Sequence, residues 1–155
     1  MGPSGIGKSE CALELLRRGH RLVADDVIEL SRTDDGGLEG RAPERVRHHI
    51  EIRGLGILSV PDLFGPESVL EAARVALICH LDEPGTVRDY ERVGIDRATE
   101  TLAGVDVTSV VLPARIGGSA ASVVEVAARE HTQRLRGVNA AERLDARLRR
   151  EMGES

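Results

Sequence analysis

The spacing of hydrophobic and polar residues predicts three helices in this chain of 155 residues. Apolar side chains recur at helical intervals over residues 9–18 and 119–136, and a glycine follows each stretch as a natural stop. A third helix follows Asn139, which resembles the first residue of a capping box. This last helix has a narrow apolar seam on a charged surface, made of Leu144, Leu148 and Met152. Such a seam either packs on the core or docks on a neighbouring subunit.

Strands are predicted between these helices, which is typical of an α/β fold. Residues 21–27 form a short apolar strand that ends in two aspartates, Asp25 and Asp26. Residues 75–81 are a near-continuous apolar run, as expected of a central strand. Residues 107–112 form another strand, which a proline stops.

The remaining segments predict hairpins and loops. The turn-forming residues 33–37 link a strand over 27–30 to a return strand over 38–42. Residues 50–53 alternate between apolar and polar side chains as a strand does, and two glycines then interrupt the pattern. Residues 62–66 are expected to form a loop.

Composition narrows the range of functions. The length indicates one domain with a single core, and the two aromatic residues, Phe64 and Tyr90, make a base-stacking nucleic-acid platform improbable. The net charge of −5 also disfavours a binder of phosphate backbones. The two cysteines do not indicate a disulfide framework, and the chain contains neither a membrane-spanning apolar run nor a signal peptide, so a cytoplasmic location is expected.

The first nine residues contain the strongest motif. Gly2-Pro3-Ser4-Gly5-Ile6-Gly7-Lys8-Ser9 fits the P-loop pattern, in which backbone N–H groups and a helix N-terminus hold phosphates. Lys8 would reach the β- and γ-phosphates of ATP, and the Ser9 hydroxyl would bind Mg²⁺. Lys8 is the only lysine among the 21 Lys and Arg residues, so the chain keeps an ammonium where P-loop chemistry needs a point charge. The alternative is an ordinary glycine-rich turn before a helix.

Two further stretches offer groups for the same site. Asp25 and Asp26 follow a predicted strand, at the edge where open α/β sheets bind ligands, and an aspartate near a P-loop holds Mg²⁺ directly or through water. The alternative is a solvated turn. Glu51 could serve the metal and Arg53 a phosphoryl group, with the nearby glycines allowing close approach of a ligand, or this segment is an edge strand whose polar residues face water.

These stretches together resemble the C-terminal catalytic domain of HPr kinase/phosphorylase. The resemblance covers nearly the whole chain and is strongest over residues 2–10, 19–26, 51–57, 62–65 and 113–128 and around Arg92. It implies a P-loop kinase core similar to that of phosphoenolpyruvate carboxykinase, with a mixed sheet and flanking helices. It also implies a cytoplasmic, ATP- and Mg²⁺-dependent serine kinase that acts on the phosphocarrier HPr, without nucleic-acid or membrane partners, commonly as a hexamer.

The resemblance also implies roles for individual residues. Lys8 is similar to the phosphate-binding catalytic lysine, and Ser9 and Glu51 to the Mg²⁺ ligands. Asp26 resembles the proton acceptor for the substrate serine, with Asp25 beside the metal or phosphate. Arg92 resembles the arginine that stabilises the transferring phosphoryl group.

Three departures from the family pattern shape the expectations. Only Met1 precedes the P-loop, so the single domain over 1–155 lacks the strand that normally comes first, and the family's upstream histidine is also absent. Gly118 stands where a second arginine is usual, and Ser119 where asparagine is usual, which predicts weak reverse phosphorylase activity. Two alternatives remain: an ATP-binding sensor with impaired catalysis, and a small-molecule kinase on the same core.

Overall fold

The computed structural model describes residues 1–2, 7–82, 97–113, 119–137 and 139–153. Helices are α1 (Lys8–Arg17), α2 (Val60–Phe64), α3 (Ala120–Leu135) and α4 (Ala140–Glu151), and two short 3-10 turns cover Glu44–Val46 and Pro66–Ser68. Strands are β1 (Glu29–Arg32), β2 (Leu38–Arg41), β3 (His49–Ile52), β4 (Gly56–Ser59), β5 (Ala72–Arg74), β6 (Leu77–Asp82), β7 (Ala98–Leu102) and β8 (Val105–Pro113). The mixed α/β class expected from the sequence is therefore confirmed.

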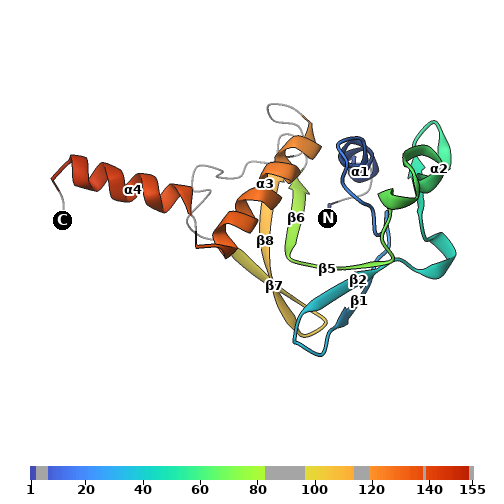
Figure 1. Cartoon of the computed structure of the whole chain (residues 1–155), viewed down its shortest axis with the longest axis horizontal. Coiled ribbons are helices and arrows are strands. Elements are labelled where there is room, and N and C mark those ends of the chain that lie inside the picture. Colours follow the sequence, from blue (N-terminus) through green and yellow to red (C-terminus); the bar gives the residue numbers. More distant parts are fainter. Residues whose placement is uncertain (3–6, 83–96, 114–118, 138, 154–155) are drawn as a thin grey trace.

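A mixed three-stranded sheet forms the centre, in the order β6-β8-β7. Strand β6 runs parallel to β8, and β7 pairs with β8 in the antiparallel sense through a two-residue turn at Ala103 and Gly104. Both residues have positive φ, as the tight hairpin turns that match strand twist require. Figure 1 shows α3 lying along one face of this sheet.

Both faces of the sheet are buried, which explains the apolar run of β6. One face packs against α3 in a cluster that includes Leu81, Val110 and Ala127. The opposite face packs Ile78 and Val107 against Leu38 of β2. We call β6, β8, β7 and α3 the sheet body.

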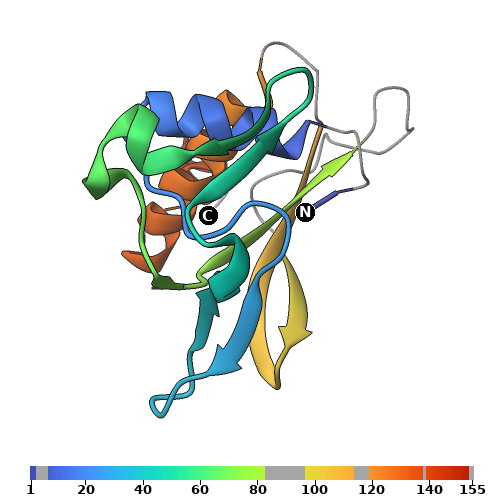
Figure 2. The ribbon, with the colours of Figure 1, turned by 90° about the vertical axis from the view of Figure 1, so that its right-hand side faces the viewer.

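A separate apolar cluster holds α1. Its buried members are Leu16 of α1, Leu22, Ile50 and Ile52 of β3, and Val60 of α2. The β3–β4 hairpin alternates as predicted, with Ile50 and Ile52 buried and their polar neighbours exposed. We call α1, β3, β4 and α2 the α1 body, and it lies beside the sheet body in Figures 1 and 2.

The antiparallel strands β1, β2 and β5 form a third sheet beneath these two bodies. The predicted turn between β1 and β2 is confirmed, because the Thr33 N–H donates to the carbonyl of Gly37 over 2.8 Å. Arg74 of β5 binds Asp35 at 2.8 Å and attaches this turn to its neighbouring strand.

The residue before the P-loop pairs with the outer edge of β6. The Met1 amino group donates to the Cys79 carbonyl, and the Leu81 N–H donates to the Met1 carbonyl over 2.7 Å. These two bonds flank His80 in the pattern of a parallel strand pair. The P-loop motif therefore starts at the edge of the central sheet.

Three predictions from the sequence need correction. Residues 21–27 do not form a strand, since only Leu22 makes an isolated bridge with Val69, and Val27 is exposed. Part of the expected loop over 62–66 is α2, and Pro61 at its start was the signal for a helix. The middle strand of the described sheet is β8, whereas β6, over most of the 75–81 run, lies at its end.

Helix α4 differs from the other long helices. Asn139 caps it as predicted, accepting hydrogen bonds from the N–H groups of Ala141 and Glu142. None of its residues is buried, and its seam residues Leu144, Leu148 and Met152 are all exposed. In Figure 1 it projects away from the rest of the molecule, so the seam does not pack on the core.

The structure bears on two expectations from composition. Among the described residues, no helix is long and apolar enough to cross a membrane. Cys11 and Cys79 are free, as expected, and burial raises the pKa of both thiols.

Candidate active site

The P-loop helix begins at a glycine that no other residue could replace without strain. Gly7, the residue before α1, has φ 97° and ψ 28°, in the left-handed region. Among the described residues no side chain caps the helix, and a helix N-terminus of this kind can bind an anion. Residues Pro3, Ser4, Gly5 and Ile6 of the predicted phosphate loop lie outside the described residues.

Lys8 and Asp26 lie together, as a shared site requires. The Lys8 Nζ atom donates to the Gly2 carbonyl over 2.9 Å and lies 3.8 Å from Oδ1 of Asp26. The Asp26 side chain is 79% exposed and that of Lys8 37% exposed, so both are open to a ligand. The ammonium thus folds back toward the start of the P-loop and pairs with Asp26, the second of the two aspartates that follow α1.

Asp25 links the helix of the P-loop to strand β3. Its Oδ1 accepts a hydrogen bond from the Ser9 hydroxyl over 2.8 Å, and its Oδ2 accepts one from the Glu51 N–H over 3.0 Å. A single carboxylate therefore brings together three segments that are 16 and 26 residues apart. The solvated-turn interpretation of Asp25 does not account for these contacts.

The segment that contains Asp25 is itself held in place by backbone bonds. Leu22 donates to the Ser68 carbonyl over 2.9 Å and accepts from the Leu70 N–H over 2.8 Å. Its side chain is buried in the cluster of the α1 body. The chain after Leu22 then turns outward, which leaves Asp25 and Asp26 facing Ser9 and Lys8.

Glu51 lies on the exposed side of β3, between two buried isoleucines. Gly54 and Gly56 form the turn of the β3–β4 hairpin, with φ of 90° and 87°. A turn therefore accounts for these glycines without a ligand. Arg53 is exposed in the same turn, so the description of an edge hairpin with polar residues in water fits this segment as well.

The described protein side chains alone do not form a complete site for the predicted Mg²⁺ ion. Among the residues that the structure describes, no group of three or more His, Cys, Asp or Glu could hold a metal ion. Ser9, Asp25 and Glu51 nevertheless supply oxygen donors of the kind that Mg²⁺ takes, and Mg²⁺ is usually held by one or two carboxylates together with substrate phosphates and water. The donor set fits a site that a bound nucleotide would complete.

Two further predicted residues, Arg92 and Gly118, also lie outside the described residues, as do the four of the phosphate loop. The bridging contact of Asp25 was not predicted, because the spacing of residues in the sequence does not show from which backbone N–H a carboxylate will accept a hydrogen bond.

Known proteins resemble this chain over nearly its whole length. The model of the HPr Serine kinase C-terminal domain family matches residues 1–148. An HPr kinase/phosphorylase of Caldicellulosiruptor bescii is 45% identical over 152 residues, covering 98% of this chain and 49% of that protein. One of Thermoanaerobacter sp. is 44% identical over 153 residues, covering 99% of this chain and 50% of that protein.

A solved structure is also similar, that of the Hpr(Ser) kinase/phosphatase from Coxiella burnetii. It matches with a TM-score of 0.80 at 34% identity, covering 88% of this chain and 83% of that one. The chain spans about half the length of the curated relatives it matches. The family match over nearly the whole chain and the agreement of both sequence and structure show that this chain belongs to the HPr Serine kinase C-terminal domain family.

Proposed function

We propose that this chain is the catalytic domain of an ATP-dependent serine kinase whose substrate is the phosphocarrier HPr. The names of its relatives support the reaction and the substrate. The observation that carries the proposal for this chain is the pair of contacts at the start of α1. Lys8 lies 3.8 Å from Asp26, and Ser9 donates to Asp25, so a phosphate-binding cation and a candidate base lie at one place.

Lys8 and the first N–H groups of α1 would bind the phosphates of ATP in this proposal. Ser9 and Glu51 would hold Mg²⁺, and Asp25 would orient the Ser9 hydroxyl through its 2.8 Å bond. When bound, Mg²⁺ supplies charge that offsets the negative charge of the β- and γ-phosphates.

Asp26 would accept the proton of the substrate serine. The serine oxygen then attacks the γ-phosphorus, and the bond from that phosphorus to the ADP oxygen breaks. The exposure of Asp26 suits this role, because the hydroxyl comes from a second protein and has to reach the carboxylate from outside. Arg92 would stabilise charge on the transferring group.

Five finer statements belong to the same proposal. The core would be similar to that of phosphoenolpyruvate carboxykinase, and residues 1–155 would form one catalytic domain that is cytoplasmic, where ATP is supplied. The chain would assemble as a homo-oligomer, a hexamer by resemblance. Reverse phosphorylase activity, in which inorganic phosphate attacks phosphoserine, would be weak, because Gly118 removes a phosphate-binding cation.

Phosphate transfer to purified HPr tests the proposal. We expect ATP- and Mg²⁺-dependent labelling of one serine on HPr, mapped by mass spectrometry. Lys8→Ala should reduce it by about 100-fold or more, since one cationic contact to a transferring phosphoryl group is typically worth this much. Arg17→Ala is the matched control, because this cation lies on the same helix, its side chain is 69% exposed, and its ion pair within the described part of the chain is with Glu14.

Each contrary result has a meaning. Labelling that survives Lys8→Ala would refute the P-loop assignment. Binding of ATP without transfer would indicate the nucleotide sensor, and transfer to a metabolite but not to HPr would indicate a small-molecule kinase.

A further inference from the structure

The α1 body and the sheet body meet at a polar contact. The apolar residues of α1 that reach a buried cluster, such as Leu16, belong to the cluster with β3 and α2. Those of α3, such as Ala127, belong to the cluster with β6 and β8. Helices α1 and α3 nevertheless lie against each other. At the end of α1 the two bodies are joined by a polar contact, made of hydrogen bonds and ion pairs.

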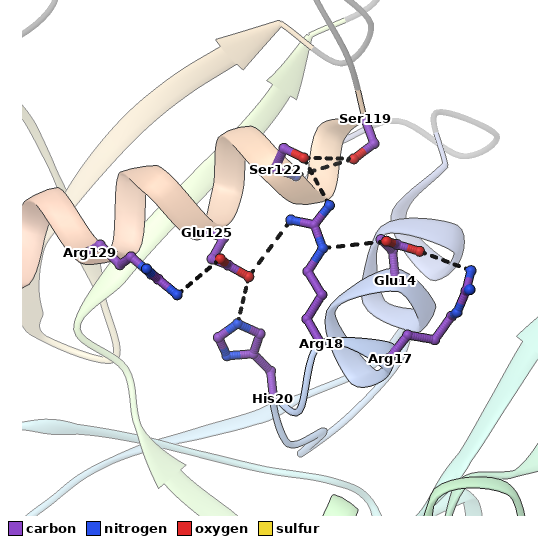
Figure 3. A network of polar contacts seen from close by, with 8 residues as sticks. All are labelled: Glu14, Arg17, Arg18, His20, Ser119, Ser122, Glu125 and Arg129. Atoms are coloured by element: carbon purple, nitrogen blue, oxygen red, sulfur yellow. Dashed lines mark hydrogen bonds and ion pairs between the residues drawn. The ribbon is translucent and has the colours of Figure 1, made fainter.

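Four residues make that contact, and we call them the interhelix clamp (Figure 3): Arg18, His20, Ser122 and Glu125. Nη2 of Arg18 donates to the Ser122 hydroxyl over 2.9 Å, and its Nη1 lies 3.7 Å from Oε2 of Glu125. Nε2 of His20 lies 2.9 Å from the same oxygen of Glu125. The Glu125 side chain is only 17% exposed, so its charge is screened less than that of a free surface carboxylate.

The backbone at the end of α1 is shaped to present these groups. The His20 N–H donates to the Leu15 carbonyl, and the Gly19 N–H donates to the Leu16 carbonyl, each over 3.0 Å. This pair of bonds, with Gly19 at φ 91°, is a Schellman motif. It reverses the chain immediately after Arg18 and places His20 beside it, facing α3 (Figure 3).

The clamp is also held from within each helix. Glu14 of α1 accepts from Nε of Arg18 at 3.4 Å, and Arg129 of α3 pairs with the other oxygen of Glu125 at 3.2 Å. Ser119, the N-cap of α3, accepts from the Ser122 N–H over 3.3 Å. The Arg18 guanidinium group is thus held from two sides, at Nε by Glu14 of its own helix and at its two Nη atoms by residues of α3.

We infer that Arg18 and Glu125 are positioning residues, which fix the angle of α1 against the sheet body and thereby place Lys8 and Ser9. A helix of ten residues is about 15 Å long, so a tilt at its C-terminal end moves its first turn. The apolar packing of α1 holds one side of it to β3, and the clamp holds the other side to α3. The consequence for ATP rests on the proposed function, whereas the mechanical role does not.

Hydrogen exchange of the chain without nucleotide tests the mechanical role. Glu125→Gln and Arg18→Gln should each speed exchange of the α1 amides by about fivefold, which corresponds to roughly 1 kcal/mol of opening free energy, and leave β8 unchanged. The double variant should exceed either single variant by little, because both remove the same contact. Arg149→Gln is the control, since this cation pairs with Asp145 within α4 and its side chain is 64% exposed.

Titration with ATP by calorimetry is the second measurement. Clamp variants should bind ATP about threefold to tenfold more weakly than the wild type and Arg149→Gln, with the kcat of transfer less affected than KM. Unchanged exchange of α1, or equal loss of protection throughout the molecule, would overturn the inference. If the wild type binds no ATP, the proposed function fails, and the exchange result alone decides the role of the clamp.

Discussion

The α1 body and the sheet body bury similar apolar side chains but differ in what they expose. Five of the candidate site residues that the structure places, Lys8, Ser9, Asp25, Asp26 and Glu51, lie on the α1 body or on the segment joined to it. The sheet body provides structural contacts instead. Met1 pairs with the edge of β6, and α3 carries the two clamp residues that bind the end of α1. The comparison indicates that one body holds the reacting groups and the other sets their orientation.

The largest expected effect on stability comes from a cavity-forming substitution in the core of the α1 body. Ile50 is 1% exposed and packs between α1 and α2, so Ile50→Ala should lower the free energy of unfolding by about 2–5 kcal/mol. Leu112→Ala is the counterpart in the sheet body. Urea denaturation followed by circular dichroism measures both.

The two core variants should differ in one respect. Ile50 neighbours Glu51, so Ile50→Ala should also weaken ATP binding under conditions where the protein stays folded, whereas Leu112→Ala should weaken it less. Equal effects of the two variants on ATP binding would mean that the α1 body contributes no more to the site than the sheet body does.

The next effect concerns the carboxylate that joins α1 to β3. Asp25→Ala leaves the Ser9 hydroxyl and the Glu51 N–H without their acceptor, which should cost about 1–3 kcal/mol of stability. Asp34→Ala, in the exposed turn between β1 and β2, is the matched control. Thermal unfolding with and without ATP compares them, and a loss of stability as small as that of the control would contradict the bridging role.

Two glycines provide a sharper comparison. Gly19 and Gly137 end α1 and α3 with φ of 91° and 81°, and an added Cβ would meet nothing within 4 Å at either site. Alanine at either position should therefore cost about 1 kcal/mol through backbone strain alone. Only Gly19→Ala should also weaken ATP binding, because only Gly19 orients a clamp residue. Equal binding by the two variants would argue against the clamp.

The clamp also predicts a dependence on pH. Hydrogen bonding from His20, together with nearby Arg129 and Arg18, holds the pKa of Glu125 below its usual range. A carboxyl whose pKa is lowered by folding stabilises the protein above its unfolded pKa of about 4.3, and this contribution disappears as pH falls through the folded pKa. The stability difference between the wild type and Glu125→Gln should thus shrink as the pH falls below about 4.5. A difference that does not shrink between about pH 4.5 and pH 3 would contradict this.

The smallest effect is expected in α4. Leu148 is 47% exposed, so Leu148→Ser should change stability by no more than about 0.5 kcal/mol. Differential scanning fluorimetry at low protein concentration measures it. A shift as large as that of Ile50→Ala would mean that α4 packs on the rest of the molecule.

Local patterns in the sequence were sufficient for much of the fold. Helical period and stop residues predicted α1 and α3 to within about two residues, Asn139 predicted the start of α4, and the turn over 33–37 followed from its residue types. Strand β7 was missed because its sequence, ATETL, has little apolar content. The strand over 21–27 was wrong because an apolar triplet does not reveal whether a partner strand is at hand.

The candidate site was predictable only where a sequence motif indicates a chemical role for its residues. The P-loop pattern identified Lys8 and Ser9, and the structure places them beside Asp26 and Asp25. The contact between Asp25 and the Glu51 N–H and the clamp between Arg18 and Glu125 join residues 26 and more than 100 apart. Such contacts depend on tertiary packing, which no local period encodes.

The most direct test of the central claim separates the binding of ATP from the removal of the proton of the substrate serine. Asp26→Asn keeps the shape of the side chain beside Lys8 but cannot accept the serine proton. We predict that this variant binds ATP with an affinity close to that of the wild type and phosphorylates HPr about 100-fold to 10,000-fold more slowly. Transfer at the wild-type rate by Asp26→Asn would contradict the claim that this carboxylate, held on the α1 body, acts as the base.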